Sequence, residues 1–340
     1  MTLTVVRGGY AELRERWSRL TRSQRPFGVP FTAPEFGEVW WSVFGPNHCG
    51  ELELLGLEDR AGELAGMIPL LRCREDAPEG AAFGFAGDHE ISDYLGLSAA
   101  DGREPEVVSA LFDHFDQRDA FSADLRGLAP GSLWPELIAS EGAARGWSVQ
   151  LSDEAVCPVV DISGGWDAYL ARLRSRDRRE VRRKLRGLRQ LRGAVSFTSF
   201  DEPAAITERL PRFMSMMAES RGDKAAFLTD QMQSFFSDLT QSLAAAGWAR
   251  LYLMSISGDP AAMVLCFVVA DELLLYNSGY DPRFRDLSAG LASKVLCIRD
   301  AVERGLTRVN FLRGDEPYKF ELGGEPAMVR RAQLRRREVL

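Results

Sequence analysis

One order of predicted secondary-structure elements occurs twice along the 340 residues of the chain. In each half, helices precede a β-hairpin, and a further strand and helix follow the hairpin. The first hairpin spans ELELLGLEDRAGELAGMIPLLR, with turn residues from Asp59 to Gly62 between two apolar runs. The second lies within Ala249–Val269, around Ser257-Gly258-Asp259. Because the chain also exceeds the usual size of one domain, the repeated order predicts two α+β units.

The boundary between the units is predicted at residue 153, so that the first covers residues 1–153 and the second residues 154–340. A connection over 153–158 separates short strand patterns at 147–151 and 159–160. A long helix is predicted from Trp166, and a strand at 308–312 is expected to finish the core. We expect the active cleft to lie between the two units.

Composition argues against several classes of protein. Apolar residues make up 45% and charged residues 27% of the chain, as in ordinary globular domains. The longest apolar run, near 261–270, is far too short for a membrane span, and the N-terminus lacks a signal-peptide pattern. We therefore expect a cytoplasmic protein without a membrane span. Five scattered cysteines without a CxxC motif and three histidines without ligand spacing argue against a metal site.

A turn of small residues opens the helix predicted at 288–303. Ser288 can cap this helix, and Ala289 and Gly290 keep bulky side chains out of its first turn. Exposed N–H groups and the positive dipole end of a helix bind phosphate oxygens well. The alternative is a small-residue turn that only packs against the sheet.

The segment FLRGDEPYKFELGG, residues 311–324, follows an apolar strand and concentrates ionisable side chains between glycines. One interpretation is a polar turn in which Arg313 pairs with Asp315 and Tyr318 packs on the core. The other is a functional site, because carboxylate, phenol and ammonium groups in one short segment can move protons and stabilise an anion.

Five segments of the sequence can be compared with known families: YNSGYDP, LSAGL, VNFLRGDEPYKFELGG, GDHEISDYLG and RDRREVRRKLRGL. Together they resemble the CelD/BcsL-like (BioF2-like) acetyltransferase family of the GNAT superfamily. The resemblance covers nearly the whole chain, most firmly Trp166 to Gly323. It departs from the general GNAT loop pattern at Leu287, where that pattern has a basic or amide residue.

The resemblance implies an α+β fold of two tandem GNAT-type units, an architecture shared with the Fem peptidyltransferases. Each unit would be a mixed, largely antiparallel sheet flanked by helices. The first unit would be degenerate and face the substrate, and the second would bind acetyl-CoA or another acyl-CoA and catalyse the transfer. The residues implied to bind the cofactor lie on the strand before the small-residue turn and on the turn itself: Tyr276, Asn277, Ser288, Ala289, Gly290 and Leu291.

Acyl transfer from a thioester to an amine removes a proton from the nucleophile, stabilises an oxyanion and protonates the leaving thiolate. Beside the resemblance, Asp315 or Glu316 is predicted as the base or orienting carboxylate, Tyr318 as proton donor to sulfur, and Lys319 as anion stabiliser. Because Met keeps most of the volume of the lysine stem, Lys319→Met is expected to leave folding nearly unchanged.

The acceptor is predicted to be a small molecule or a glycan. The residues proposed to contact it lie in the polar loop GDHEISDY, near the end of a Met-rich helix and in the segment after the last predicted strand: Asp88, His89, Asp93, Tyr94, Arg221 and Arg313. For the polar loop, the alternative is a solvated turn without a ligand.

A basic cluster interrupts an otherwise acidic sequence. Between Arg172 and Arg192, eleven Arg or Lys residues accompany only Asp177 and Glu180, in a chain of net charge −7. Two acids cannot neutralise these bases through i,i+4 pairs, so an anionic partner is expected. Three partners fit: the adenosine phosphates of coenzyme A, an anionic glycan or nucleotide sugar, and nucleic acid. The absence of RNP, helix-turn-helix and zinc patterns argues against nucleic acid.

The leading hypothesis is an acyl-CoA-dependent N-acyltransferase, with acetyl transfer to an amino sugar or polysaccharide precursor implied by the resemblance. A second hypothesis is an aminoacyl or peptidyl transferase of Fem type. A third is a catalytically degenerate GNAT pair that acts as a binding factor in exopolysaccharide biosynthesis. Leu287 favours the third, whereas the intact RGDEPYK segment favours the first two.

Overall fold

The structure is a computed structural model that describes residues 3–23, 28–48, 50–73, 82–191, 194–220 and 226–336. The chain divides into two compact units, residues 1–155 with 328–340, and residues 156–327. Each unit combines a mixed sheet with flanking helices, which confirms the predicted α+β class. None of the described helices is long and apolar enough to cross a membrane.

The first unit is built from the elements β1 (Thr4–Gly8), α1 (Tyr10–Ser23), α2 (Pro34–Phe44), β2 (Glu51–Glu58), β3 (Leu64–Arg72), β4 (Phe83–Phe85), β5 (Ser98–Ala99), α3 (Glu104–Gln117), β6 (Ser122–Leu128) and α4 (Trp134–Ala144). Two long strands, β7 (Trp147–Asp161) and β13 (Glu325–Arg336), contribute their residues 147–155 and 328–336 to it. The strand order is β1-β2-β3-β4-β6-β13-β7. Its core is rich in buried aromatic rings, including Phe112, Phe115 and Trp147.

The second unit is built from the elements α5 (Trp166–Arg172), α6 (Ser175–Gln190), β8 (Val195–Phe200), α7 (Pro203–Ser220), α9 (Asp230–Ala245), β9 (Ala249–Ile256), β10 (Asp259–Val269), β11 (Glu272–Tyr280), the 3-10 helix η2 (Pro282–Leu287), α10 (Ala289–Glu303), β12 (Arg308–Asn310) and α11 (Pro317–Glu321). Its strands follow the order β7-β12-β11-β10-β9-β8. All pairs are antiparallel except β11 with β12.

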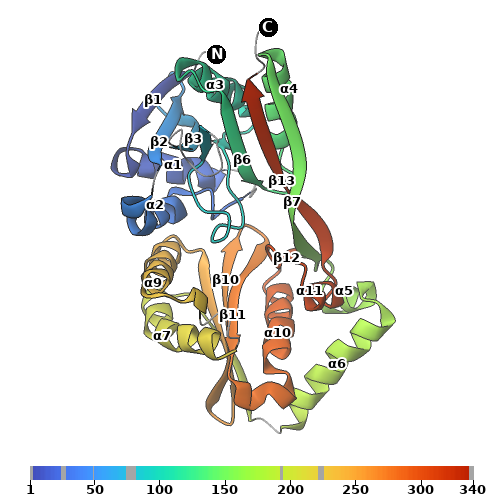
Figure 1. Ribbon diagram of the computed structural model, residues 1–340. Coiled ribbons are helices and arrows are strands. Elements are labelled where there is room, and N and C mark those ends of the chain that lie inside the picture. The colour runs from blue at the N-terminus through green and yellow to red at the C-terminus, as the bar shows by residue number, and fades with distance from the viewer. Residues whose placement is uncertain are drawn as a thin grey trace. The chain divides into compact units, whose positions relative to one another are not determined.

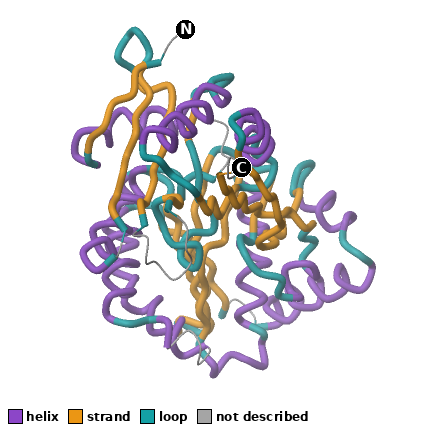
Figure 2. The backbone as a smooth tube through the Cα atoms, turned by 45° about the horizontal axis from the view of Figure 1, so that its top comes forward, coloured by secondary structure: helices purple, strands orange, loops and turns teal. Residues whose placement is uncertain are grey.

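Helices cover both faces of the second sheet. Figure 1 shows α7 and α9 on one side of β10 and β11 and α10 on the other. The tube in Figure 2 shows the same strands running between helices on either side. The apolar strand β10 fits this position because seven of its consecutive residues, 261–267, are no more than 1% exposed. A strand buried on both faces lacks the polar alternation of a half-exposed one.

The structure differs from the predicted elements in three places. The expected connection over 153–158 is part of the single strand β7, because neighbouring segments satisfy its backbone there; the Gly314 N–H, for example, donates to the Val156 carbonyl at 3.0 Å. The helix from Trp166 breaks at Leu173 and Arg174, which have extended backbone (ψ 143° and 146°). Leu173 is buried in the core at this break.

The third difference is β13, which the sequence analysis did not predict. Its many arginines hide the alternation of the buried residues Ala332 and Leu334, which pack in the first unit. Residues 330–335 pair with β6. The second unit therefore ends at residue 327, whereas the predicted unit extended to residue 340.

Candidate functional site

Strands β11 and β12 of the second unit run parallel and then diverge. Their pairing covers three residues of each strand and ends where Leu274 lies opposite Asn310. Beyond this point β11 continues beside β10, whereas the chain after β12 turns toward β7, and the Phe311 N–H donates to the Pro158 carbonyl at 2.9 Å. We call this divergence the fork. It separates two segments that would otherwise continue as neighbouring strands.

A β-bulge in β11 lies just beyond the fork. The register between β10 and β11 shifts at Tyr276, and a bulge changes which face the following side chains occupy. Tyr276 packs its ring against Phe236 of α9, with 5.9 Å between centroids. Ser278 is two residues further on, yet its hydroxyl accepts a hydrogen bond from Lys294 of α10, on the opposite face. The bulge therefore directs a polar group of β11 toward α10.

Lys319 holds the loop that follows β12. Its ammonium donates to the carbonyls of Leu312 (3.3 Å), Arg313 (2.6 Å) and Gly314 (3.3 Å), and lies 2.9 Å from a carboxylate oxygen of Glu316. A lysine has three N–H donors, so this buried ammonium is fully occupied. Lys319→Met would remove the donor from one buried and two partly buried carbonyls, so from this geometry we expect a loss of stability, whereas the sequence predicted nearly unchanged folding.

The start of α10 offers two unoccupied backbone donors. The N–H groups of Ala289 and Gly290 form no hydrogen bond within the described part of the chain, whereas the Leu291 N–H donates to the Ser288 carbonyl at 3.0 Å. Ser288 itself has left-handed backbone (φ 54°) and makes no side-chain cap, contrary to prediction. Its hydroxyl instead accepts a hydrogen bond from Lys184 of α6. A cation and two N–H donors therefore meet at this helix start.

Two glycines permit close approach around this turn. A Cβ at Gly290 would lie 3.0 Å from the ring of Tyr280, and a Cβ at Gly279 would lie 2.4 Å from the backbone nitrogen of Met217 on α7. The second distance is one that real Cβ atoms do not adopt. Glycine at both positions therefore lets β11 pack closely against α7 and against the first turn of α10.

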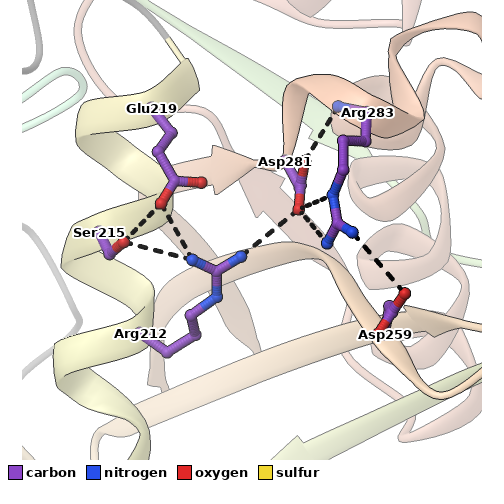
Figure 3. Close-up of polar contacts among 6 residues, drawn as sticks. All are labelled: Arg212, Ser215, Glu219, Asp259, Asp281 and Arg283. Carbon is purple, nitrogen blue, oxygen red and sulfur yellow. Dashed lines mark hydrogen bonds and ion pairs between the residues drawn. The ribbon is translucent and has the colours of Figure 1, made fainter.

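A network of ion pairs fixes the turn between β11 and α10 (Figure 3). The buried carboxylate of Asp281 accepts hydrogen bonds from Arg283 (2.8 Å) and from Arg212 of α7 (3.5 Å). Arg212 also donates to Glu219 at 3.0 Å. The hydrogen bonds from Arg283 hold the pKa of Asp281 below its ordinary value. The network thereby anchors η2, and with it the start of α10, to α7.

Lys294 is a buried cation that the sequence analysis missed. Its ammonium donates to the Ser278 hydroxyl (3.1 Å) and the Gly290 carbonyl (3.0 Å), and lies 5.1 Å from the centroid of the Tyr318 ring. Burial lowers the pKa of Lys294 to about 8, and the charge of Lys319 acts in the same direction. A buried ionisable group with a strongly shifted pKa is a candidate functional residue. Lys294 connects β11, α10 and α11.

The residues predicted for catalysis have different environments. Tyr318 is half-buried, with its ring edge-on to Phe311 at 6.0 Å. Asp315 is exposed and forms no ion pair or hydrogen bond in the described ranges, so the alternative pairing with Arg313 is not observed. The carboxylate beside Lys319 belongs to Glu316 instead. Of the two predicted carboxylates, Asp315 thus has no protein partner among the described residues, whereas Glu316 pairs with Lys319.

The strand residues predicted to bind the cofactor are both half-buried. The ring of Tyr276 packs in tilted contacts against Phe267, with 4.7 Å between centroids, and against Phe236, so it contributes to the aromatic core beside α9. The side-chain oxygen of Asn277 accepts a hydrogen bond from the Ser278 N–H at 3.1 Å. Their contact with a cofactor stays a prediction.

Four predicted acceptor-binding residues lie in the first unit: Asp88, His89, Asp93 and Tyr94. His89 Nε2 lies 3.1 Å from a guanidinium nitrogen of Arg126. Tyr94 is 3% exposed and packs edge-on against Phe31, so its ring serves the core. Arg221 lies outside the described residues, and its role stays a prediction. Among the residues that are described, no group of three His, Cys, Asp or Glu side chains forms a metal site.

A comparison with known protein families gives a match within the second unit. The family model of the acetyltransferase (GNAT) domain matches residues 175–320. The matched range contains the fork, the start of α10 and Lys294. The matched part of the second unit is thus similar to a GNAT acetyltransferase domain. A comparison with curated proteins gives no match.

Solved structures extend the likeness of fold to nearly the whole chain. FemX is 13% identical with a TM-score of 0.65, covering 97% of this chain and 96% of FemX. A conserved protein of unknown function from Bacteroides thetaiotaomicron is 10% identical with a TM-score of 0.63, covering 98% and 100%. A C-terminal domain described as that of a lysylphosphatidylglycerol synthetase, from Agrobacterium fabrum, is 12% identical with a TM-score of 0.59, covering 96% and 92%. At these identities the likeness concerns the fold.

Proposed function

We propose that this protein is an acyl-CoA-dependent N-acyltransferase. The observation that carries the proposal is the fork between β11 and β12, which opens beside the start of α10 inside the range matched by the GNAT domain. By the family resemblance, the strand before the helix binds the pantetheine arm of coenzyme A and the helix start binds its diphosphate. In the second unit, the strand before the helix is β11 and the helix start is that of α10.

The start of α10 fits a diphosphate. The N–H groups of Ala289 and Gly290 have no partner within the described residues, and Lys184 adds a positive charge beside Ser288. The helix dipole favours an anion at the same place. Gly290 also leaves space that a side chain would fill, since a Cβ there already meets the Tyr280 ring.

The side chains around the fork suit acyl transfer. Bound acyl-CoA supplies an acyl group activated as a thioester. Lys294, with its pKa lowered to about 8, holds a proton at Nζ near neutral pH and can also release one there. Tyr318 lies beside it and carries the hydroxyl that we assign as proton donor to the leaving sulfur. Asp315 is exposed and can orient an incoming amine, and Lys319 fixes the loop that carries Asp315.

We propose that the acceptor is an amino group of an amino sugar or polysaccharide precursor, on the strength of the resemblance to the CelD/BcsL-like family. A Fem-type aminoacyl or peptidyl transferase is the second candidate, and its support is the likeness of fold to FemX across both units. A binding factor without catalysis is the third. Leu287, which is 36% exposed beside the helix start, is its main support.

Gly290→Asp is expected to weaken acetyl-CoA binding at least about a hundredfold, because it sets a carboxylate against the diphosphate. Gly290→Asn is the matched control, since it adds nearly the same volume without the charge. The loss of affinity for acetyl-CoA in Gly290→Asn should be much smaller. Isothermal titration calorimetry measures both. Equal affinities of the Asp variant and the native protein would show that the start of α10 does not hold the diphosphate.

A further inference from the structure

A groove runs along α6 beside α10 and α11 in the second unit. Its volume is about 710 Å³, which lies in the range of roughly 300 to 1,000 Å³ typical of small-molecule sites. Residues of α6 from Arg176 to Arg186 form one wall, over a length of about 15 Å at 1.5 Å per helical residue. Leu291 and Val295 of α10 and Leu322 after α11 form apolar parts of the lining.

The acids of α6 in this groove are already neutralised. Asp177 accepts a hydrogen bond from Arg174 at 2.6 Å. Glu180 binds Arg183 at 2.6 Å and lies 3.2 Å from Lys184. The hydrogen bond from Arg183, followed by that from Lys184, lowers the pKa of Glu180 to about 2. These pairs account for both carboxylates of the helix, and Glu321 on α11 is the remaining acid of the lining.

Four further arginines of the groove have no such partner: Arg176, Arg179, Arg182 and Arg186. Within the described ranges, none of them forms an ion pair or a hydrogen bond, and all four are exposed. A guanidinium matches the geometry of phosphate oxygens and can bind them through two parallel hydrogen bonds. The groove therefore carries a surplus of positive charge that only a multiply charged anion would balance.

The groove and the start of α10 are adjacent. Lys184 lines the groove and also donates to Ser288, the residue before α10. Leu291 belongs both to the first turn of α10 and to the lining. A ligand with its diphosphate at Ala289 and Gly290 would therefore have its next phosphate close to the arginines.

We propose that this groove binds the 3′-phosphorylated adenosine of coenzyme A and makes the protein selective for the 3′-phosphate. The inference rests on the proposed function and adds the group that recognises the nucleotide end of the donor. The apolar lining from α10 suits the adenosine, and the arginines suit the 3′-phosphate. The limited volume and length favour a single nucleotide over a nucleic-acid helix.

Calorimetry with coenzyme A and with 3′-dephospho-coenzyme A tests this proposal. The native protein should bind coenzyme A about ten- to a hundredfold more tightly, as expected for one or two charge-assisted hydrogen bonds. In the double variant Arg179→Gln, Arg186→Gln, this ratio should fall below about threefold. Arg189→Gln is the matched control, because Arg189 is an exposed residue of α6 outside the groove. The control should keep the native ratio.

The possible outcomes separate the two proposals. If coenzyme A does not bind the native protein, the proposed function fails, and this inference fails with it. If both ligands bind with equal affinity, or if the double variant weakens both alike, only the inference is overturned. An equal loss of selectivity in Arg189→Gln would also overturn it. So would binding of an RNA duplex that depends on Arg179 and Arg186 while the binding of coenzyme A does not.

Discussion

Replacement of Lys294 by Met is expected to remove most acyl transfer and, at the same time, to raise the melting temperature at pH 7. The ammonium is buried, and burial lowers its pKa from an ordinary value near 10.5 to about 8. At neutral pH the folded protein therefore carries a charge that its surroundings disfavour. Met fills a similar volume without this charge, so we expect a gain in the free energy of unfolding of about 1–3 kcal/mol.

The pH dependence of stability gives this prediction a second observable. Between pH 8 and about pH 10.5, Lys294 binds a proton in the unfolded chain and not in the folded protein. The free energy of unfolding contributed by this group therefore rises with pH across that window. Below pH 8 its unfavourable contribution is present in full. Lys294→Met should remove this rise, which denaturant titrations at pH 7.5, 9 and 10 would measure.

The control for Lys294→Met is Ser278→Ala, which keeps the charge and removes one of its hydrogen-bond acceptors. That variant should be less stable than the native protein. If Lys294→Met instead melts well below the native protein and retains its turnover per folded molecule, Lys294 is a structural residue. The proposed role at the fork would then be abandoned.

Lys319→Met is expected to lower turnover about a hundredfold, because the loop that carries Asp315 loses its anchor, and also to lower the melting temperature by several degrees. Three carbonyls of the loop after β12 lose their donor; the one at Leu312 is buried, where an unpaired group costs about 1–3 kcal/mol, and the other two are partly buried. The loop that carries Asp315 would then no longer be fixed. Turnover per folded molecule, measured well below the melting temperature, separates the two effects.

Glu316→Gln tests which partners of Lys319 matter. It removes the charge beside Lys319 and leaves the three carbonyl acceptors in place. If Lys319 acts by holding the loop, this variant should keep turnover within about threefold of the native value. A native melting temperature together with native turnover in Lys319→Met would contradict both the positioning role and the predicted catalytic role.

The sequence predicted the fold class well because the apolar patterns of the second unit are strong. The hairpin predicted within Ala249–Val269 corresponds to β9 and β10, and the repeated hairpins identified two α+β units. The start of α10 and the polar segment after β12 were also identified as places of interest, since small residues and clustered charges are visible without coordinates.

Several features of the site depend on tertiary contacts that sequence patterns do not show. The three carbonyls bound by Lys319 cannot be inferred from residue types, because they are backbone groups of the loop after β12. The bulge at Tyr276 leaves no sequence signal either. Lys294 does have a sequence signal. It lies four residues after Gly290 on an otherwise apolar helix face, and this position indicates a buried lysine.

A crystal structure of the protein with acetyl-CoA would test the central claim most directly. We predict that the diphosphate accepts hydrogen bonds from the N–H groups of Ala289 and Gly290, and that the thioester lies beyond the fork near Ser278 and Lys294. Diphosphate oxygens about 2.7–3.2 Å from those nitrogens would support the account. Acetyl-CoA bound away from the fork and from the start of α10 would contradict it.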